Sequence, residues 1–251
     1  MQRTPARFWA WSNAFLVSAA VLPSLAQGAA PVLGKGFYIA SLPEPGETSF
    51  AGASEDGSFA AGLFAGAAGD SRLFIWDVET GARLVNAPPE WRVQGVSAVS
   101  RDGSTVIGRL RTGVGQPSQA FRWTETTGFQ ALGRLSNGAG DASYADAVSD
   151  DGSVVVGVSD TPDGRRAFRW TTATGMVNLG VLSGGDESRA SGVSGDGRIV
   201  SGAVTTADVG LFGQFGLWTQ QSGWRTLVQP EDYEINAQTY AISADGSVVI
   251  G

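Results

Sequence analysis

The residues best placed to do chemistry in this sequence are aspartates that recur at a regular spacing. A short Ser-x-Asp-Gly motif appears five times, and its glycines lie 46, 49, 45 and 49 residues apart. The paired aspartates and glycines are Asp56-Gly57, Asp102-Gly103, Asp151-Gly152, Asp196-Gly197 and Asp245-Gly246. A calcium loop needs several oxygen ligands within about 12 residues, and each motif offers only one or two carboxylates. The motif instead indicates a structural turn, because Asp-Gly supplies the φ > 0 residues that a tight β-turn requires.

The absence of two residue types narrows the chemistry further. The sequence contains no His and no Cys, which excludes Ser-His-Asp triads, thiolate nucleophiles and the usual zinc ligands. Paired carboxylates remain available, as in glycoside hydrolases. An enzyme of that kind should gather non-repeated acids such as Asp163, Glu187 and Asp208 into one cleft, whereas a scaffold should scatter them. We assign no catalytic, cofactor-binding or metal-binding residue and expect no cofactor.

A second marker keeps the same period as the aspartate motif. Four tryptophans recur 47, 47 and 48 residues apart, and each is followed five residues later by a glycine. They are Trp76, Trp123, Trp170 and Trp218. Two independent markers with one period indicate a structural repeat of about 47 residues. Because these tryptophans occupy matched places, we expect them to pack between units rather than to form a glycan-binding platform.

Each repeat is expected to form four short strands. In the third unit, residues 145–148 and 154–157 flank the Asp-Gly turn, residues 167–171 alternate as a third strand, and residues 176–182 form a fourth. The β-branched and aromatic content favours strand over helix. Four strands in about 40–50 residues suit one blade of a β-propeller. The predicted fold is therefore all-β, a propeller of four full units and a split or partial fifth, with a β-helix as the alternative.

The N-terminus has the features of a secretory signal peptide. Two arginines precede an apolar stretch at 8–22, and the small residues Ser24 and Ala26 fit a cleavage site after residue 26. Cleavage there would remove residues 1–26 and leave a short linker (27–35) before the repeat region (36–251). No second apolar stretch is long enough to span a membrane. We therefore expect a mature chain without a membrane span that is periplasmic, on the outer-membrane surface or extracellular.

The two ends of the repeat region complement each other. Residues 36–42 have the pattern of a fourth strand, and residues 239–251 have the pattern of a first hairpin. The two segments could share one unit and close a ring of five. Alternatively, the chain is a fragment of a longer array. The predicted units cover residues 50–88, 96–135, 145–182, 190–229 and, in part, 239–251.

The third unit carries the most complete set of motifs. It contains Ser-x-Asp-Gly-Ser, then Val-Val-Val-Gly, Ala-Phe-Arg-Trp-Thr and Thr-Gly-Met-Val-Asn-Leu-Gly. This combination resembles the extracellular HAF-repeat family over residues 36–251, although the name-giving His is absent from every unit. The resemblance implies export and a propeller-like fold, in some members as the passenger of an autotransporter. It implies no established activity.

The arginine of the Phe-Arg-Trp motif is expected to have a structural role. Arg122 and Arg169 could stack on a neighbouring tryptophan or pair with a turn carboxylate. Function is better sought where the repeat is irregular, because insertions in repeat proteins lie on one face. The connections between second and third strands vary most, at residues 64–71, 111–118, 159–165 and 205–214.

The composition also limits the partners. A formal net charge of −7 argues against a nucleic-acid partner, because phosphate binding needs a basic surface. The leading hypothesis is a secreted or cell-surface scaffold, without catalysis, for an unidentified glycan or protein. The alternatives are an exported carbohydrate-active propeller that uses carboxylates and a truncated autotransporter passenger.

Overall fold

The computed structural model describes residues 46–66, 69–138, 140–205, 214–227 and 241–250. The predicted signal peptide, the linker and the strand at 36–42 lie outside these residues, so the expected pairing of the two chain ends lies outside them too. In the described part the secondary structure is strand, turn and loop, without a helix. No helix there is long and apolar enough to cross a membrane.

The strands form four sheets of four and one hairpin. Sheet 1 contains β1 (Gly46–Ala53), β2 (Phe59–Gly66), β3 (Ser71–Asp77) and β4 (Gly81–Val85). Sheet 2 contains β5 (Arg92–Val99), β6 (Val106–Arg111), β7 (Gln119–Thr124) and β8 (Gly128–Gly133). Sheet 3 contains β9 (Ser143–Val148), β10 (Val154–Thr161), β11 (Gly164–Thr171) and β12 (Gly175–Asn178). Sheet 4 contains β13 (Ser188–Val193), β14 (Ile199–Val204), β15 (Gln214–Thr219) and β16 (Gly223–Thr226), and the hairpin contains β17 (Ala241–Ile242) and β18 (Val249–Ile250).

Every sheet is an antiparallel meander in chain order. This confirms the predicted all-β fold of four-stranded units. The β-helix alternative is wrong, because a β-helix pairs the strands of successive coils in parallel. The physical reason is local: each Asp-Gly turn reverses the chain and forces its two flanking strands to pair antiparallel.

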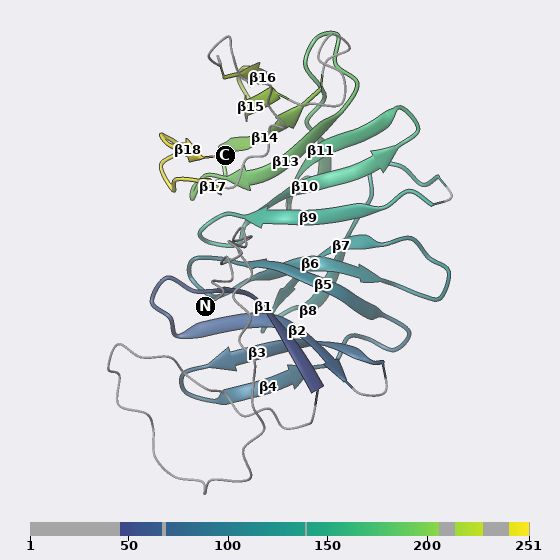
Figure 1. Cartoon of the computed structure of the whole chain (residues 1–251), viewed down its shortest axis with the longest axis vertical. Helices are drawn as coiled ribbons and strands as arrows, with labels where there is room; N and C mark the ends of the chain where they lie inside the picture. Colours follow the sequence, from purple (N-terminus) through teal and green to yellow (C-terminus); the bar gives the residue numbers. More distant parts are fainter. Residues whose placement is uncertain (1–45, 67–68, 139, 206–213, 228–240, 251) are drawn as a thin grey trace, which may run out of the picture.

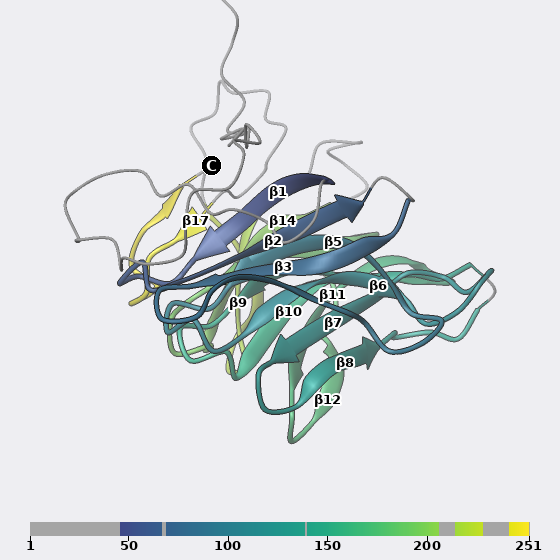
Figure 2. The same ribbon diagram turned by 90° about the horizontal axis from the view of Figure 1, so that it is seen from below.

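The sheets follow one another in chain order, from β1–β4 at the bottom of Figure 1 to β13–β16 at the top. The first strands of successive sheets contact each other, from β1 to β5, β9 and β13, and β17 continues the series against β13. The sheets therefore fan out from an inner edge formed by their first strands. Figure 2 shows the same fan from below.

Apolar side chains fill the space between neighbouring sheets. One cluster joins sheets 1 and 2, a second joins sheets 2 and 3, and a third joins sheets 3 and 4. Trp123 and Trp170, which are 3% and 4% exposed, lie in the first and second of these clusters. Trp76 and Trp218 are half-buried. The four tryptophans occupy equivalent register positions. Each lies opposite the third residue after the glycine of the Ser-x-Asp-Gly turn in its sheet. They form core and partial core, not an exposed platform.

The repeated Ser-x-Asp-Gly turn is held by its own side chains. Ser149 Oγ donates to Asp151 Oδ1 at 2.8 Å and accepts the N–H of Val154 at 2.9 Å, and Asp151 Oδ1 also accepts the N–H of Ser153. Only the glycine has a positive φ, 68° at Gly152, and the aspartate does not. The expectation that both residues take φ > 0 is wrong, because the carboxylate closes a wider turn through hydrogen bonds.

A second glycine recurs within the second strand of each sheet. These glycines are Gly62, Gly108, Gly157 and Gly202. Each lies beside a β-bulge, at which the first strand carries one extra residue: Ala51, Ser97, Asp146 and Ser191, respectively. A Cβ added at any of these glycines would overlap a main-chain oxygen of the first strand. The glycine therefore permits the bulge, and a bulge redirects the side chains around it.

Candidate functional site

The fan has two ends with different character. The turn face is the end that carries the five Ser-x-Asp-Gly turns, and the loop face is the opposite end, which carries the connections between second and third strands. On the turn face, main-chain hydrogen bonds link successive turns: Glu55 N to Arg101 O, Asp102 N to Asp150 O, and Gly195 N to Ala244 O. Because these bonds cross from sheet to sheet, the turns fix how neighbouring sheets are arranged at the inner edge.

The two Phe-Arg-Trp arginines extend this linkage. Arg122 Nε donates to the carbonyl of Gly152 at 3.1 Å, and Arg169 Nε donates to the carbonyl of Gly197 at 3.1 Å. Each arginine thus binds the turn of the next sheet through a main-chain oxygen, not through the turn carboxylate or a tryptophan ring. Burial lowers the pKa of both guanidinium groups from their ordinary value. This part of the repeat is structural.

The turn aspartates are held ionised by their hydrogen bonds. The hydroxyl of Ser54 and the N–H of Ser58 lower the pKa of Asp56 to about 2, and Ser243 and Ser247 lower that of Asp245 to about 2 in the same way. Seven carboxylates and two arginines lie within the five turns. The described residues contain no group of three or more potential metal ligands. The turn face is therefore a negatively charged structural surface.

Acidification is expected to destabilise the chain through these turns. An aspartate with a lowered folded pKa contributes stability that is complete above its unfolded pKa of about 3.9 and is lost as the pH falls through the folded value. The loss should therefore develop between about pH 4 and about pH 2. The pKa of Asp146 is raised mainly by burial, so this group favours the folded chain on acidification. It is one group against several turn aspartates with lowered pKa values. Thermal unfolding followed by circular dichroism across this range checks the expectation.

A double variant serves as the control for this pH dependence. Asp56→Asn and Asp245→Asn, combined in one chain, keep an oxygen acceptor in both turns but remove the titrating groups. The double variant should show a shallower loss of stability below about pH 4 than the parent chain. An unfolding midpoint that stays constant down to pH 2 in the parent would contradict the assignment of these pKa values to the turns.

The inner edge is hollowed between sheets 2, 3 and 4. The cavity there, which we call the inner pocket, has a volume of about 430 Å³. The polar side chains that line it are Ser97, Arg109, Tyr144, Asp146, Arg165 and Arg189. Three guanidinium groups, one phenol and one carboxylate thus face the same space. Such a set binds anionic oxygen groups by charge-assisted hydrogen bonds.

The carboxylate of the inner pocket is already engaged. Asp146 is the extra residue of the bulge in β9, and its side chain is only 19% exposed. Arg189 binds it with two hydrogen bonds, Nε to Oδ2 at 3.3 Å and Nη2 to Oδ1 at 3.2 Å. Burial raises the pKa of Asp146, and the charges of Arg189 and Arg109 oppose that shift. Asp146 therefore orients Arg189 across the gap between sheets 3 and 4.

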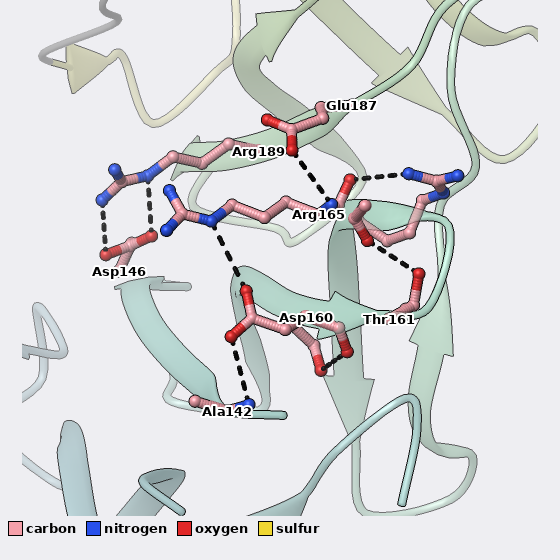
Figure 3. A network of polar contacts seen from close by, with 10 residues as sticks. Ala142, Asp146, Asp160, Thr161, Arg165, Glu187 and Arg189 are labelled. Carbon is pink, nitrogen blue, oxygen red and sulfur yellow. Dashed lines mark hydrogen bonds and ion pairs between the residues drawn. The ribbon is translucent and has the colours of Figure 1, made fainter. Parts of the chain in front are cut away.

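Arg165 lies beside this pair, at the start of β11, as Figure 3 shows. Its Nε is 3.4 Å from Asp160 Oδ1, and Asp160 Oδ2 accepts the N–H of Ala142 at 3.2 Å. Glu187 Oε1 accepts the main-chain N–H of Arg165 at 3.4 Å. The network therefore fixes the backbone on both sides of the two-residue turn between β10 and β11, and it places the Arg165 side chain at the pocket.

Arg109 differs from the other two arginines of the pocket. It lies on β6 opposite Gly95, and its guanidinium sits over the ring of Tyr144 at 5.8 Å from the centroid. Among the described residues it forms no ion pair. A cation–π contact leaves most of the donors of the guanidinium available. Arg109 is therefore the guanidinium best placed to receive a bound anion.

The acids that were expected to mark an enzyme do not line the inner pocket. Asp163 is exposed in the turn between β10 and β11, and its main-chain oxygen accepts a bond from Arg166. Glu187 is exposed and engaged with the Arg165 backbone. Asp208 lies outside the described residues. Within the described part of the variable connections, only the one at 159–165 contributes to the pocket, through Arg165.

Most of the pocket residues had not been singled out from the sequence, yet they follow the repeat. The bulge residue lies three positions before the serine that follows each first strand, and a second pocket position lies five before it. The five-before positions hold Ser49, Gly95, Tyr144 and Arg189, and the three-before positions hold Ala51, Ser97, Asp146 and Ser191. Aligning the units shows that these positions vary while the surrounding turn recurs. That variation within the strand, not loop length, is the signal that points to the pocket.

Comparison with known proteins supports the fold. No protein-family model matches the sequence, and no curated protein matches it either. Among solved structures, TolB from Acinetobacter baumannii aligns with 81% of this chain at a TM-score of 0.56 and 14% identity. The chain folds as a β-propeller. A putative TolB from Agrobacterium tumefaciens covers 74% of the chain (TM-score 0.51, 16% identity), and a puromycin-hydrolyzing peptidase from Mycobacterium tuberculosis covers 77% (TM-score 0.50, 16% identity).

The alignments span only part of each of these proteins. They cover 48% of the Acinetobacter TolB chain, 63% of the Agrobacterium chain and 31% of the peptidase chain. At these identities the likeness concerns the fold, and fold alone does not assign an activity. The function has to be argued from the inner pocket itself.

Proposed function

We propose that this chain is a secreted or cell-surface repeat scaffold that binds a ligand at the inner pocket without catalysis. The observation that carries the proposal is the chemistry of that pocket. It presents three guanidinium groups and a tyrosine around a single carboxylate, and Arg189 holds that carboxylate in two hydrogen bonds. Ligand sites combine a concave surface with a few fixed polar groups, and the network around Asp146 and Arg165 fixes these groups.

The alternative of a carbohydrate-active enzyme has less support. A glycosidase needs two carboxyl groups about 5–9.5 Å apart that face one sugar. Asp146 lines the pocket, but Asp160 points its carboxylate at Arg165 and the Ala142 backbone. Glu187 likewise serves the backbone of Arg165. These acids therefore act as orienting groups for the arginines.

Export is part of this proposal and rests on the N-terminal sequence and on the resemblance of the units to extracellular HAF repeats. That the repeat region is the passenger of an autotransporter remains a prediction. Expression of the full chain in a bacterium, followed by N-terminal sequencing of the product outside the cytoplasm, tests export, and the sequence of the gene downstream tests the passenger alternative. Cleavage after residue 26 is the expected result, and retention of an uncleaved chain in the cytoplasm would overturn the export part of the proposal.

Binding at the inner pocket is tested with the full chain on arrays of immobilised glycans and peptides. We expect at least one class of ligand whose binding is lost when Arg165 and Arg189 are both replaced by Gln. Replacing Arg198, an exposed residue of the turn face, should leave binding unchanged. Thermal unfolding confirms that the double variant is folded, and Tyr144→Ser provides a second, uncharged change in the same pocket.

The same material distinguishes a scaffold from an enzyme. Bound ligands should be recovered chemically unchanged after prolonged incubation. Turnover of a glycan that is abolished by Glu187→Gln or Asp163→Asn, with folding intact, would overturn the scaffold proposal and favour the carbohydrate-active alternative. Binding that survives every pocket variant would show that the ligand site lies elsewhere on the propeller.

A further inference from the structure

The inner pocket also indicates what kind of ligand it binds. We propose that it receives an extended acidic peptide segment, one carboxylate of which pairs with Arg109. This inference rests on the proposed binding function and adds the chemical class of the ligand. Four features of the described residues carry it: the charge balance in the pocket, the free strand edges, the spacing of arginines along β6 and the charge of the turn face.

The charge balance favours an anion at Arg109. Arg189 is neutralised by Asp146, and Arg165 is neutralised by Asp160. Arg109 contacts the ring of Tyr144 and has no ion pair among the described residues. The position equivalent to Arg109 is Leu63 in sheet 1 and Val158 in sheet 3, six residues after each turn glycine. Sheet 2 therefore has an exposed arginine at the position where sheets 1 and 3 have an apolar residue.

The walls of the pocket offer main-chain groups as well as side chains. In the described part of the chain, β5, β9 and β13 each pair with a single strand, so one edge of each strand carries no ladder. The pocket-lining segments 95–97 and 144–146 belong to two of these free edges. Unpaired N–H and C=O groups on a strand edge bind the backbone of an extended peptide. A peptide uses this feature, whereas a small acid uses only the guanidinium.

The arginines of sheet 2 match the spacing of an extended peptide. Arg109 and Arg111 are both exposed, lie on the same side of β6 and are two residues apart. In a strand that separation is about 6.6–6.8 Å, which is also the distance between alternate side chains of an extended peptide. Arg92 lies directly opposite Arg111, and both line a second pocket of about 600 Å³ beside the loop after β6, where Glu90 is the one carboxylate against these two guanidinium groups among the described lining residues. Carboxylates at alternate positions of a peptide would therefore meet Arg109 and then the Arg92–Arg111 pair.

The charge of the turn face directs such a peptide away from that face. The turn face carries seven carboxylates against two arginines within its repeated turns, so it repels an acidic chain. Charge asymmetry of this kind orients an approaching ligand before contact. A glycan fits the pocket less well, because Tyr144 is the only aromatic residue among the described ones that line it, and Arg109 already covers its ring.

Fluorescence anisotropy with the full chain tests the inference. The probe is a labelled peptide in which Glu alternates with Gly, and the control probe is the same peptide with Gln in place of Glu. We expect the Glu peptide to bind at least tenfold more tightly, as the loss of one charge-assisted hydrogen bond implies. Added salt should weaken this binding, since the contacts are partly exposed.

Substitutions in the pocket, with a matched control on the turn face, locate the binding. Arg109→Gln should weaken the Glu peptide about tenfold, and Arg111→Gln should weaken it to a smaller extent. Arg198→Gln, the same chemical change on the turn face, should have no effect. Arg109→Lys, which keeps the charge but loses the fork of donors, should fall between the parent and Arg109→Gln. Unfolding midpoints within a few degrees of the parent show that these variants are folded.

Equal affinity for the Glu and Gln peptides, or an unchanged affinity in Arg109→Gln, would overturn the inference. Displacement of the Glu peptide by glutarate at the same carboxylate concentration would also overturn it, in favour of a small organic acid. These failures are separate from failure of the scaffold proposal. A different array ligand that is lost with Arg165 and Arg189 would leave binding at the inner pocket standing while the acidic-peptide assignment fell.

Discussion

Replacing Gly157 with alanine is expected to lower the free energy of unfolding by more than about 3 kcal/mol. Gly157 lies in the middle of β10, beside the bulge of β9. An added Cβ would overlap the main-chain oxygen of Tyr144, and a backbone atom cannot move aside as a flexible side-chain end can. Either the bulge must flatten or the two strands must separate, and both outcomes break ladder hydrogen bonds between buried residues.

The same substitution should disturb the inner pocket, because the bulge that Gly157 permits carries Asp146 into it. We therefore expect Gly157→Ala to lose both stability and ligand binding, even where the remaining fold is intact at low temperature. Urea denaturation followed by circular dichroism measures the first effect. Gly113→Ala is the control, since its Cβ would meet only the Cγ atom of Gln116, at an ordinary contact distance of 3.4 Å, and it should change stability by less than about 0.5 kcal/mol. A loss below 1 kcal/mol in Gly157→Ala would show that the bulge is not a requirement of the fold.

Replacing Trp170 with alanine is expected to cost about 3–5 kcal/mol. Trp170 is 4% exposed and packs in the cluster between sheets 2 and 3, beside Phe168 and Val155. Truncation removes most of the contact area of a large side chain and leaves a cavity that the rigid sheets on either side cannot close. Because stability in repeat proteins depends on the interfaces between neighbouring units, the damage should be centred on this interface.

Trp218 provides the comparison for Trp170. It occupies the same register position in sheet 4 but is half-buried, so Trp218→Ala should cost clearly less than Trp170→Ala. Chemical denaturation monitored by circular dichroism avoids the change in fluorescence that either substitution causes. Equal costs at both positions would mean that the repeated tryptophan contributes through local strand pairing and not through burial between sheets.

Much of the architecture was predictable because short segments of the sequence determine its strands and turns. An Asp-Gly turn and the alternation of Ala-Phe-Arg-Trp-Thr each depend on residues within about ten positions of each other, so strands and hairpins follow from local preference. The division into four-stranded units follows from the period. The prediction was too simple at the turn itself, where the carboxylate of Asp151, through its bonds to Ser149 and Ser153, allows a wider loop with one positive φ.

The inner pocket was not predictable in the same way. Arg109 and Arg165 are 56 residues apart along the chain, and Arg165 and Arg189 are 24 apart. The three belong to different strands of three different sheets. The sequence by itself determined the repeat, its strands and its structural turns, because each depends on neighbouring residues. Only the tertiary structure decided that the bulges opposite Gly108, Gly157 and Gly202 direct variable residues to one inner edge. A bulge depends on the register between two strands, and the pocket depends on how the sheets pack against each other.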